Sequence, residues 1–163
     1  MAGHEDYSAD YAGQHGRFTV IPAAYVFLRR GESVLLQQRA GTGYYDGYWA
    51  AGAAGHVEQG ESVFSAAIRE ASEELGVTIL ESDLRAVTAM HRTGATGAAI
   101  DERLDVFFTC SAWSGEPQLQ EDKASDLRWF PLEELPEPVV PHELFVLDLL
   151  RSGPVPPVVA YGF

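Results

Sequence analysis

Apolar residues recur at strand spacing in several short stretches of the chain. These stretches run from Phe18 to Leu28, Val34 to Gln38, Leu84 to Met90, Leu104 to Cys110 and Leu127 to Phe130. Turn-forming residues interrupt them, as at Gly31-Glu32 and in the Gly- and Tyr-bearing loop from Ala40 to Tyr48. Short apolar runs bounded by such residues predict β-strands, with the first two joined as a hairpin.

A helical spacing of apolar residues appears between the second and third of these strands. Phe64, Ile68, Ala71 and Leu75 fall on one side of a helix wheel and are suited to face a core. Downstream, Pro131 to Leu135 predicts a short helical turn. A second helix is expected from about Pro141 to Leu150, with the prolines at 154, 156 and 157 stopping it. Strands and helices in this order predict an α/β fold, with a mixed sheet flanked by helices on both sides.

Composition supports one domain with a short segment at each end. The chain has 163 residues, enough for one conventional core. We expect a flexible N-terminal arm at residues 1–16, the domain at 17–152 and a Pro-rich C-terminal tail at 153–163. No internal repeat or linker is present, and no apolar run approaches the length of a membrane span.

Charge and cysteine content narrow the function classes. A formal net charge of −13 argues against binding to nucleic-acid backbone or to an anionic membrane, because both need a basic surface. The single cysteine, Cys110, lies in an apolar run and predicts a buried, inert thiol. The N-terminus lacks the basic start and apolar core of a signal peptide, so we expect a cytoplasmic protein.

Three acids on the first helix are the main candidate for chemistry. Glu70, Glu73 and Glu74 have i, i+3 and i+4 spacing, which places their carboxylates on one helix face. This face is separate from the apolar side, so we expect the three acids to face away from the core. Like charges repel at this spacing unless a cation compensates them, and Mg²⁺ prefers carboxylate and carbonyl oxygens. The alternative, on these three residues alone, is a solvated acidic helix face.

The residues around these acids fit one extended pattern. From Gly55 to Val77 the sequence matches G-x5-E-x7-R-E-U-x-E-E-x-G-U, with U an apolar residue, at every fixed position. The segment resembles the Nudix box, and the order of predicted elements resembles Nudix hydrolases of the MutT type from about residue 18 to 150. This resemblance implies a Nudix α/β/α sandwich. It also implies an enzyme that uses Mg²⁺, or Mn²⁺, to hydrolyse a nucleoside diphosphate linked to another moiety.

The resemblance also implies roles for particular residues. Glu70, Glu73 and Glu74 correspond to the metal-binding acids, and the residue before the first glycine of the box, Ala54, lends its backbone carbonyl to the metal. Families differ in which glutamate takes a proton from water, so Glu70 and Glu73 both stay open as the general base.

Two further residues of the box match a structural pair. Glu61 and Arg69 correspond to a brace that holds the loop against the helix through a charge-assisted hydrogen bond. Breaking this brace is expected to misplace the acids.

Candidates outside the box are less specific. The segment from Trp113 to Pro117 resembles one in bacterial MutT-type enzymes, where a glutamate four residues after the proline, here Glu121, reaches the metal and takes part in catalysis. The same residues also fit an ordinary turn. Lys123 and Arg39 are candidates for phosphate contacts, although both also fit solvent-exposed positions. Tyr48, with its aromatic neighbours, is a candidate for stacking on a base or for covering the edge of the core.

Three other positions near the expected cleft have open roles. His56 fits either a metal ligand or a residue that packs and hydrogen-bonds. His91 and Arg92 end a strand, where they could touch substrate or lie half-exposed.

The absence of two residue types that mark particular Nudix subfamilies limits the class of substrate. Between Gly76 and Thr109 there is no proline and no tyrosine, which within the family argues against the ADP-ribose and dinucleoside-polyphosphate types. The resemblance therefore favours a nucleoside triphosphate, including one with an oxidised base, hydrolysed to the monophosphate and pyrophosphate. A nucleotide sugar or ADP-ribose type of substrate, or a silent nucleotide-sensing module, are the alternatives. A homodimer is plausible for the family.

The approach to the box departs from the common pattern. Alanines precede Gly55 where many relatives have proline and glycine. The Ala-Gly-His sequence at 54–56 is similar to the isopentenyl diphosphate isomerase branch of the family. That branch uses a cysteine upstream of the box, whereas Cys110 lies after it, which disfavours an isomerase.

Overall fold

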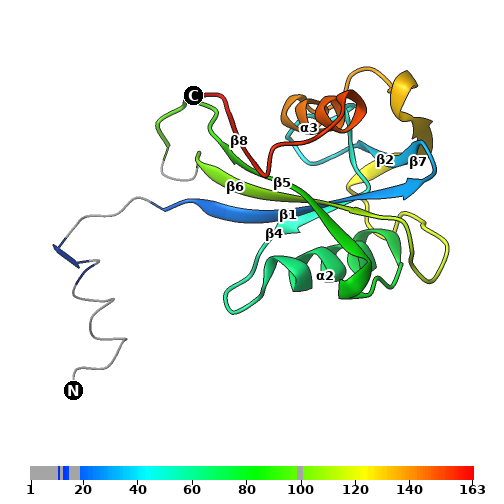
Figure 1. Cartoon of the computed structure of the whole chain (residues 1–163), viewed down its shortest axis with the longest axis horizontal. Coiled ribbons are helices and arrows are strands. Elements are labelled where there is room, and N and C mark those ends of the chain that lie inside the picture. The colour runs from blue at the N-terminus through cyan, green and yellow to red at the C-terminus, as the bar shows by residue number, and fades with distance from the viewer. Residues whose placement is uncertain (1–10, 12, 15–18, 99–100) are drawn as a thin grey trace.

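The computed structural model describes residues 11, 13–14, 19–98 and 101–163. Most of the predicted N-terminal arm lies outside the described residues. The predicted fold is confirmed, because a mixed sheet lies between two helices, α2 (Val63–Leu75) and α3 (Pro141–Ser152), as Figure 1 shows. None of the described helices is long and apolar enough to cross a membrane.

In the described part of the chain, the sheet has eight strands. The main path follows the order β3-β2-β1-β6-β5-β8, while β4 pairs with β1 and β7 pairs with β2. β1 pairs in parallel with β6, as β5 does with β8, and the other pairings are antiparallel. The strands are β1 (Ile21–Arg30), β2 (Ser33–Arg39), β3 (Trp49–Ala51), β4 (Ala53–His56), β5 (Leu84–Arg92), β6 (Arg103–Cys110), β7 (Ala124–Pro131) and β8 (Val158–Tyr161). Two short 3-10 turns, η1 (Glu81–Asp83) and η2 (Leu132–Glu134), precede β5 and α3.

β1 divides the core into two layers because its side chains alternate between the faces of the sheet. Ala24, Val26 and Leu28 pack with α2, whereas Ala23, Tyr25 and Phe27 pack with α3. Both faces of this central strand are buried, as its near-continuous apolar sequence requires.

Helix α2 has a clear start and end. The Ser62 side chain caps the N-terminus by accepting a hydrogen bond from Ser65 N, and Gly76 ends the helix in the left-handed conformation with φ of 69°. Ala71 and Leu75 are fully buried, as predicted. The expectation for Phe64 is wrong in part, since this ring contacts Phe108 but stays 36% exposed in the first turn.

The C-terminal segment predicted as a tail contributes a strand. β8 pairs with β5 from Ala89↔Val158 to Arg92↔Tyr161 and extends the sheet at one edge. This segment therefore folds back on its own chain, next to the end of β5 that leads to the pocket described below.

Candidate active site

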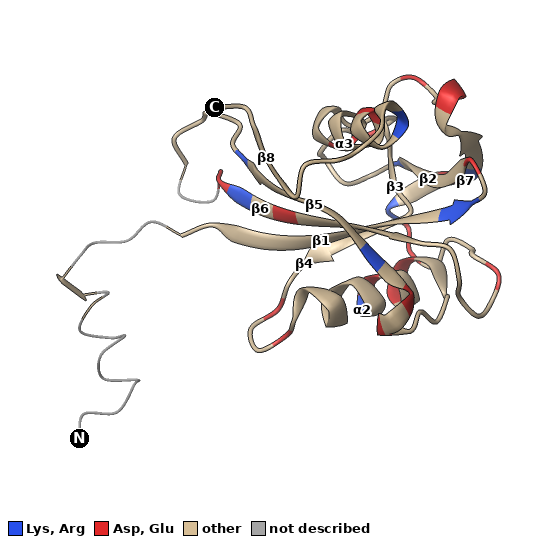
Figure 2. Ribbon diagram, in the orientation of Figure 1, with Lys and Arg blue, Asp and Glu red and all other residues tan. Residues whose placement is uncertain are grey.

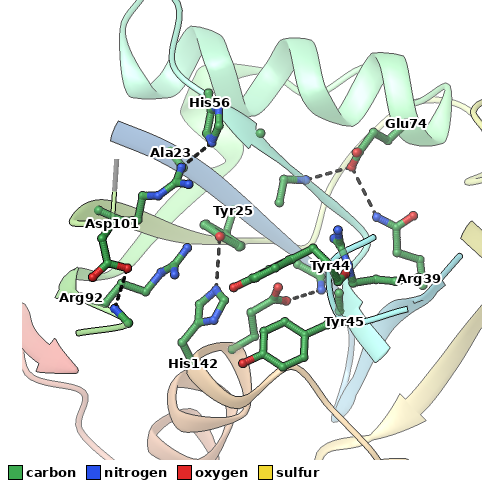
Figure 3. Close-up of a pocket in the computed structure, with 18 of the residues that line it drawn as sticks. Ala23, Tyr25, Arg39, Tyr44, Tyr45, His56, Glu74, Arg92, Asp101 and His142 are labelled. Atoms are coloured by element: carbon green, nitrogen blue, oxygen red, sulfur yellow. Dashed lines mark hydrogen bonds between the residues drawn. The ribbon is translucent and has the colours of Figure 1, made fainter. Parts of the chain in front are cut away.

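A cavity of about 490 Å³ opens between α2 and α3, over β1 and β4 (Figure 3). Its lining comes from parts of the chain that are far apart in sequence. It includes Tyr25, Gln37, Arg39, Tyr44, Tyr45, Ala54, Gly55, His56, Glu74, Arg92, Asp101, Arg103, His142 and Glu143. In Figure 3, Glu74 lies on the same side of the cavity as Arg39 and Tyr45, whereas Arg92 and Asp101 lie on the opposite side. The ring of Tyr44 extends across the cavity toward Arg92.

Glu74 is the acid of the box that enters the cavity. Its Oε2 accepts hydrogen bonds from Ala54 N at 2.9 Å and from Gln37 Nε2 at 3.5 Å. Burial, followed by the charges of Glu70 and Glu121, raises the pKa of Glu74 to about 8. The expectation that all three helix acids face away from the core is therefore wrong for Glu74, which is only 9% exposed. The Ala54 amide stabilises this buried carboxylate.

Arg69 connects the other acids of the box. Its Nε and Nη2 donate to the two carboxylate oxygens of Glu61 at 2.9 and 3.0 Å. Nη1 donates to Glu70 at 2.6 Å and to Glu73 at 3.1 Å, and Nη2 also donates to His56 O at 3.1 Å. The hydrogen bonds from Arg69, followed by the one from the Glu58 amide, hold the pKa of the Glu61 carboxyl below its usual value. One guanidinium thus ties the loop after β4 to α2, which is the arrangement that the predicted brace requires.

The position of the acids along α2 is unfavourable without a cation. Glu70, Glu73 and Glu74 lie in the last two turns, where the helix dipole is negative (Figure 2). Burial also raises the pKa of Glu70, with the charge of Glu73 adding to it. A hard divalent cation would compensate these charges, and carboxylate oxygens are the donors that Mg²⁺ and Mn²⁺ prefer. The chemistry of the donor set fits such a metal.

The carboxylates of the box acids do not point toward a common metal position in this structure. Among the described residues, no group of three His, Cys, Asp or Glu side chains is arranged to hold a metal ion. Glu70 and Glu73 point to Arg69, and Glu74 points to Ala54 N. Metal binding therefore requires at least some of these carboxylates to turn from their present partners.

Glu121 and Lys123 lie near these acids although they are distant in sequence. Backbone hydrogen bonds from Gln118 N to Leu75 O and from Gln120 N to Glu74 O hold their segment against the end of α2. Lys123 Nζ lies 2.8 Å from Glu121 Oε2. Lys123 also interacts electrostatically with Glu70 and Glu74. The structure thus brings Glu121 into the neighbourhood of the box acids.

Of the predicted substrate contacts, Arg39 lines the cavity and Tyr48 does not. Arg39 Nε donates to Tyr44 O at 2.7 Å, and its Nη2 donates to Thr42 Oγ1 at 3.1 Å. The aromatic rings that face the cavity are those of Tyr44 and Tyr45, and Tyr48 packs against Tyr45 with ring centroids 5.1 Å apart.

Sequence reasoning missed a polar group on the α3 side of the cavity. His142 Nε2 lies 3.2 Å from Tyr25 Oη, and a carboxylate oxygen of Glu143 accepts a hydrogen bond from Ala51 N. Burial, then the charges of the surrounding arginines, lowers the pKa of His142 to about 3, and burial raises that of Glu143 to about 7. Two adjacent polar residues in the first turn, directly before the apolar run 144–147 of α3, were the available signal.

Comparison with known proteins agrees with this geometry. A NUDIX domain profile matches residues 19–149. The chain belongs to the NUDIX family. This confirms the predicted family and the predicted class of enzyme, a Nudix hydrolase that cleaves pyrophosphate linkages.

The known Nudix proteins that this chain resembles differ in activity. Isopentenyl-diphosphate Delta-isomerase from Rhodobacter capsulatus is 32% identical over 148 residues, covering 85% of this chain and 83% of the relative. NAD-capped RNA hydrolase NudC from Pseudomonas aeruginosa is 31% identical over 153 residues, covering 90% of this chain but only 50% of the relative. A MutT NUDIX hydrolase structure from Burkholderia pseudomallei has a TM-score of 0.72 at 25% identity, covering 80% of this chain and 97% of that one. Because these relatives differ in activity, membership of the family does not identify the substrate, which depends on the residues that line the cavity.

Proposed function

We propose that this Nudix protein hydrolyses a nucleoside triphosphate, including one with an oxidised base, to the monophosphate and pyrophosphate with Mg²⁺ or Mn²⁺. One observation carries the proposal: the box acids and Glu121 gather beside a cavity that also holds Arg39 and two tyrosine rings. An acidic cluster binds the cation, an arginine fork suits phosphate oxygens, and aromatic rings suit a base.

Each group has a defined task in this reaction. Glu70, Glu73, Glu74 and Glu121, with the Ala54 carbonyl, would hold the metal, which supplies charge stabilisation and an activated water when bound. Glu70, Glu73 or Glu121 is the general base. Arg39 and Lys123 bind phosphate oxygens, and Glu61 orients Arg69 so that the acids keep their places.

A NAD-type dinucleotide is the second candidate. It is favoured by the similarity to NudC over 90% of this chain. The chain spans half the length of that relative, and its net charge of −13 disfavours a long RNA partner. The cleaved bond and the role of the acids would be the same.

An isomerase is disfavoured despite the 32% identity to isopentenyl-diphosphate Delta-isomerase. The sole cysteine, Cys110, is 1% exposed, packs in the core layer on the α2 side and donates to Ala112 O. It does not line the cavity.

The deciding experiment measures product release from a substrate panel. The panel contains canonical and oxidised nucleoside triphosphates, NAD, ADP-ribose, nucleotide sugars and isopentenyl diphosphate, each with Mg²⁺, Mn²⁺ or EDTA. Metal-dependent release of pyrophosphate from a triphosphate is the expected result. Faster cleavage of NAD would replace the first candidate by the second, and silence on all diphosphate compounds would favour a nucleotide sensor. The cytoplasmic location and a homodimer stay predictions from the sequence.

A further inference from the structure

Arg103, the first residue of β6, directs its guanidinium into the cavity beside His56. Its Nη1 lies 2.7 Å from His56 Nε2, and this is its one hydrogen bond to the described part of the chain. Because a guanidinium only donates, His56 must accept through an unprotonated ring nitrogen. The remaining N–H groups of Arg103 are free to bind a ligand.

This pairing is unusual because three acids surround Arg103 in sequence. Asp101 accepts hydrogen bonds from Thr93 Oγ1, Gly94 N and Thr96 N, so its carboxylate closes the 93–101 loop. Glu102, the residue before β6, pairs with His91 at 2.8 Å. Asp105 is fully buried and pairs with Arg92. Each of these carboxylates has another partner, so among the described residues Arg103 has no carboxylate within ion-pair distance, although its charge acts on Asp105.

The four side chains of Arg92, Asp105, Arg103 and His56 together carry a positive charge, although the Asp101 carboxylate also lines the cavity. Arg92 and Asp105 compensate each other, which leaves the charge of Arg103 next to a neutral His56. Three other described arginines have no carboxylate partner. Arg29 and Arg85 donate to backbone carbonyls at exposed turns, and Arg39, on the other side of the cavity, donates to Tyr44 O and Thr42 Oγ1. An unpaired guanidinium that faces a cavity is suited to a bound anion.

The position of this charge indicates which part of a substrate it meets. Ala54 and His56 are two residues apart on β4, a separation of about 7 Å along a strand. Arg103 thus lies about the length of a short phosphate chain beyond the end where Ala54 contacts Glu74. Of the two tyrosines suited to a base, Tyr45 lies on the side of Glu74, away from Arg92 and Asp101 (Figure 3), whereas the ring of Tyr44 extends across the cavity toward Arg92.

We propose that Arg103, positioned by His56, is a phosphate-binding subsite for the substrate group on the far side of the cleaved linkage from the nucleoside. The inference rests on the proposed function and deepens it, because it selects substrates whose distal group is anionic. A nucleoside triphosphate meets this condition, whereas a nucleotide sugar presents an uncharged sugar to the same position.

Binding of inorganic pyrophosphate tests the subsite without any need for turnover. Pyrophosphate is titrated by calorimetry, in EDTA, into the wild-type protein, Arg103→Gln, Arg103→Lys and the control Arg85→Gln. We expect Arg103→Gln to weaken binding about tenfold or more, since a hydrogen-bonded charge is lost. Arg103→Lys should recover part of the affinity, and Arg85→Gln, an equal change of charge outside the cavity, should bind like wild type. A thermal melt of each variant confirms folding.

The outcomes separate this inference from the proposed function. Wild-type affinity in Arg103→Gln, or no pyrophosphate binding by the wild-type protein, would overturn the subsite whatever the enzyme hydrolyses. Loss of binding in Arg103→Gln supports it even if no triphosphate in the panel is cleaved. Where a triphosphate is cleaved, Arg103→Gln should raise its KM more than that of a nucleotide sugar, and an equal rise for both would overturn the assignment to the distal phosphate.

Discussion

The carboxylate of Glu70 occupies the space that a side chain at Gly55 would need. A Cβ atom at position 55 would lie 2.0 Å from Glu70 Oε1 and 2.2 Å from Glu70 Cδ. Gly55 is thus required by close approach, since the fold places a predicted metal ligand directly over the backbone of β4.

Gly55→Ala is expected to inactivate the enzyme without unfolding it. The added methyl group displaces the flexible end of Glu70, and a shift of about 1 Å in a catalytic group can cost about 100-fold in rate. Metal-dependent turnover and the thermal midpoint are measured together. Gly31→Ala is the matched control because nothing lies within 4 Å of a Cβ there, although its φ of 55° makes the change mildly destabilising. Retained turnover in Gly55→Ala would mean that Glu70 is not needed at its present position.

Glu61→Gln tests the brace. The change removes the charge from a two-point hydrogen bond to Arg69, whose other nitrogen contacts hold Glu70 and Glu73. We expect turnover to fall about 10- to 100-fold, as for groups that orient metal ligands, with a small loss of stability. Glu116→Gln is the control, since the ion pair of Glu116 with Arg30 is long, at 3.4 Å, and exposed. Equal effects in the two variants would remove the special role of Glu61.

The box and the main elements were predictable because local patterns determine them. The helical spacing of apolar residues predicted α2. Pro141 was predicted to start the second helix, and it is the first residue of α3. The short strands β3, β4 and β8 were not predicted. Each has only three or four residues, and it is a strand because it pairs with a distant part of the chain, which a short local pattern does not predict.

The cavity was less predictable for the same reason. Its walls combine β1, residues 94–98 and α3. Nothing in the local sequence around His142 or Arg103 therefore predicts that these residues line the same cavity as Glu74. The choice between Tyr48 and its neighbours Tyr44 and Tyr45 depends on the path of the 40–48 loop, where the Asp46 carboxylate accepts from Thr42 N and Gly43 N. The burial of Glu74 depends on the position of the Ala54 amide, which donates a hydrogen bond to it. A helix wheel gives no information about residues outside the helix.

Glu74→Gln should separate activity from stability. The glutamine removes a predicted metal ligand, so metal-dependent turnover is expected to fall about 100-fold or more. Burial makes the charged carboxylate costly, and the neutral amide should raise the free energy of unfolding in EDTA at pH 8 by on the order of 1 kcal/mol. Urea denaturation measures this, with Glu73→Gln as the control because its side chain is 51% exposed. A Glu74→Gln protein that is active, or less stable than Glu73→Gln, would contradict the assignment.

His142 and Glu143 are expected to oppose each other in the pH dependence of stability. Burial, followed by the charges of Arg92, Arg39 and Arg103, lowers the pKa of His142 from 6.5 to about 3, so between these values the unfolded chain binds more protons and stability falls as the pH falls. Burial raises the pKa of Glu143 from 4.5 to about 7, despite the Ala51 amide and Arg39. Between 4.5 and 7 the folded chain therefore binds more protons, and this contribution to stability rises as the pH falls.

Single substitutions should expose each contribution, because the two windows overlap between pH 4.5 and 6.5. Relative to wild type, His142→Gln should gain stability on acidification from pH 6.5 to 4.5, and Glu143→Gln should lose it, each by on the order of 1–2 kcal/mol. The free energy of unfolding in urea at pH 4.5, 5.5 and 6.5 measures both trends, and the double variant should follow the wild-type dependence. If both single variants run parallel to wild type, these two side chains do not keep their shifted pKa values in the folded protein, and the polar α3 side of the cavity is more hydrated than its burial implies.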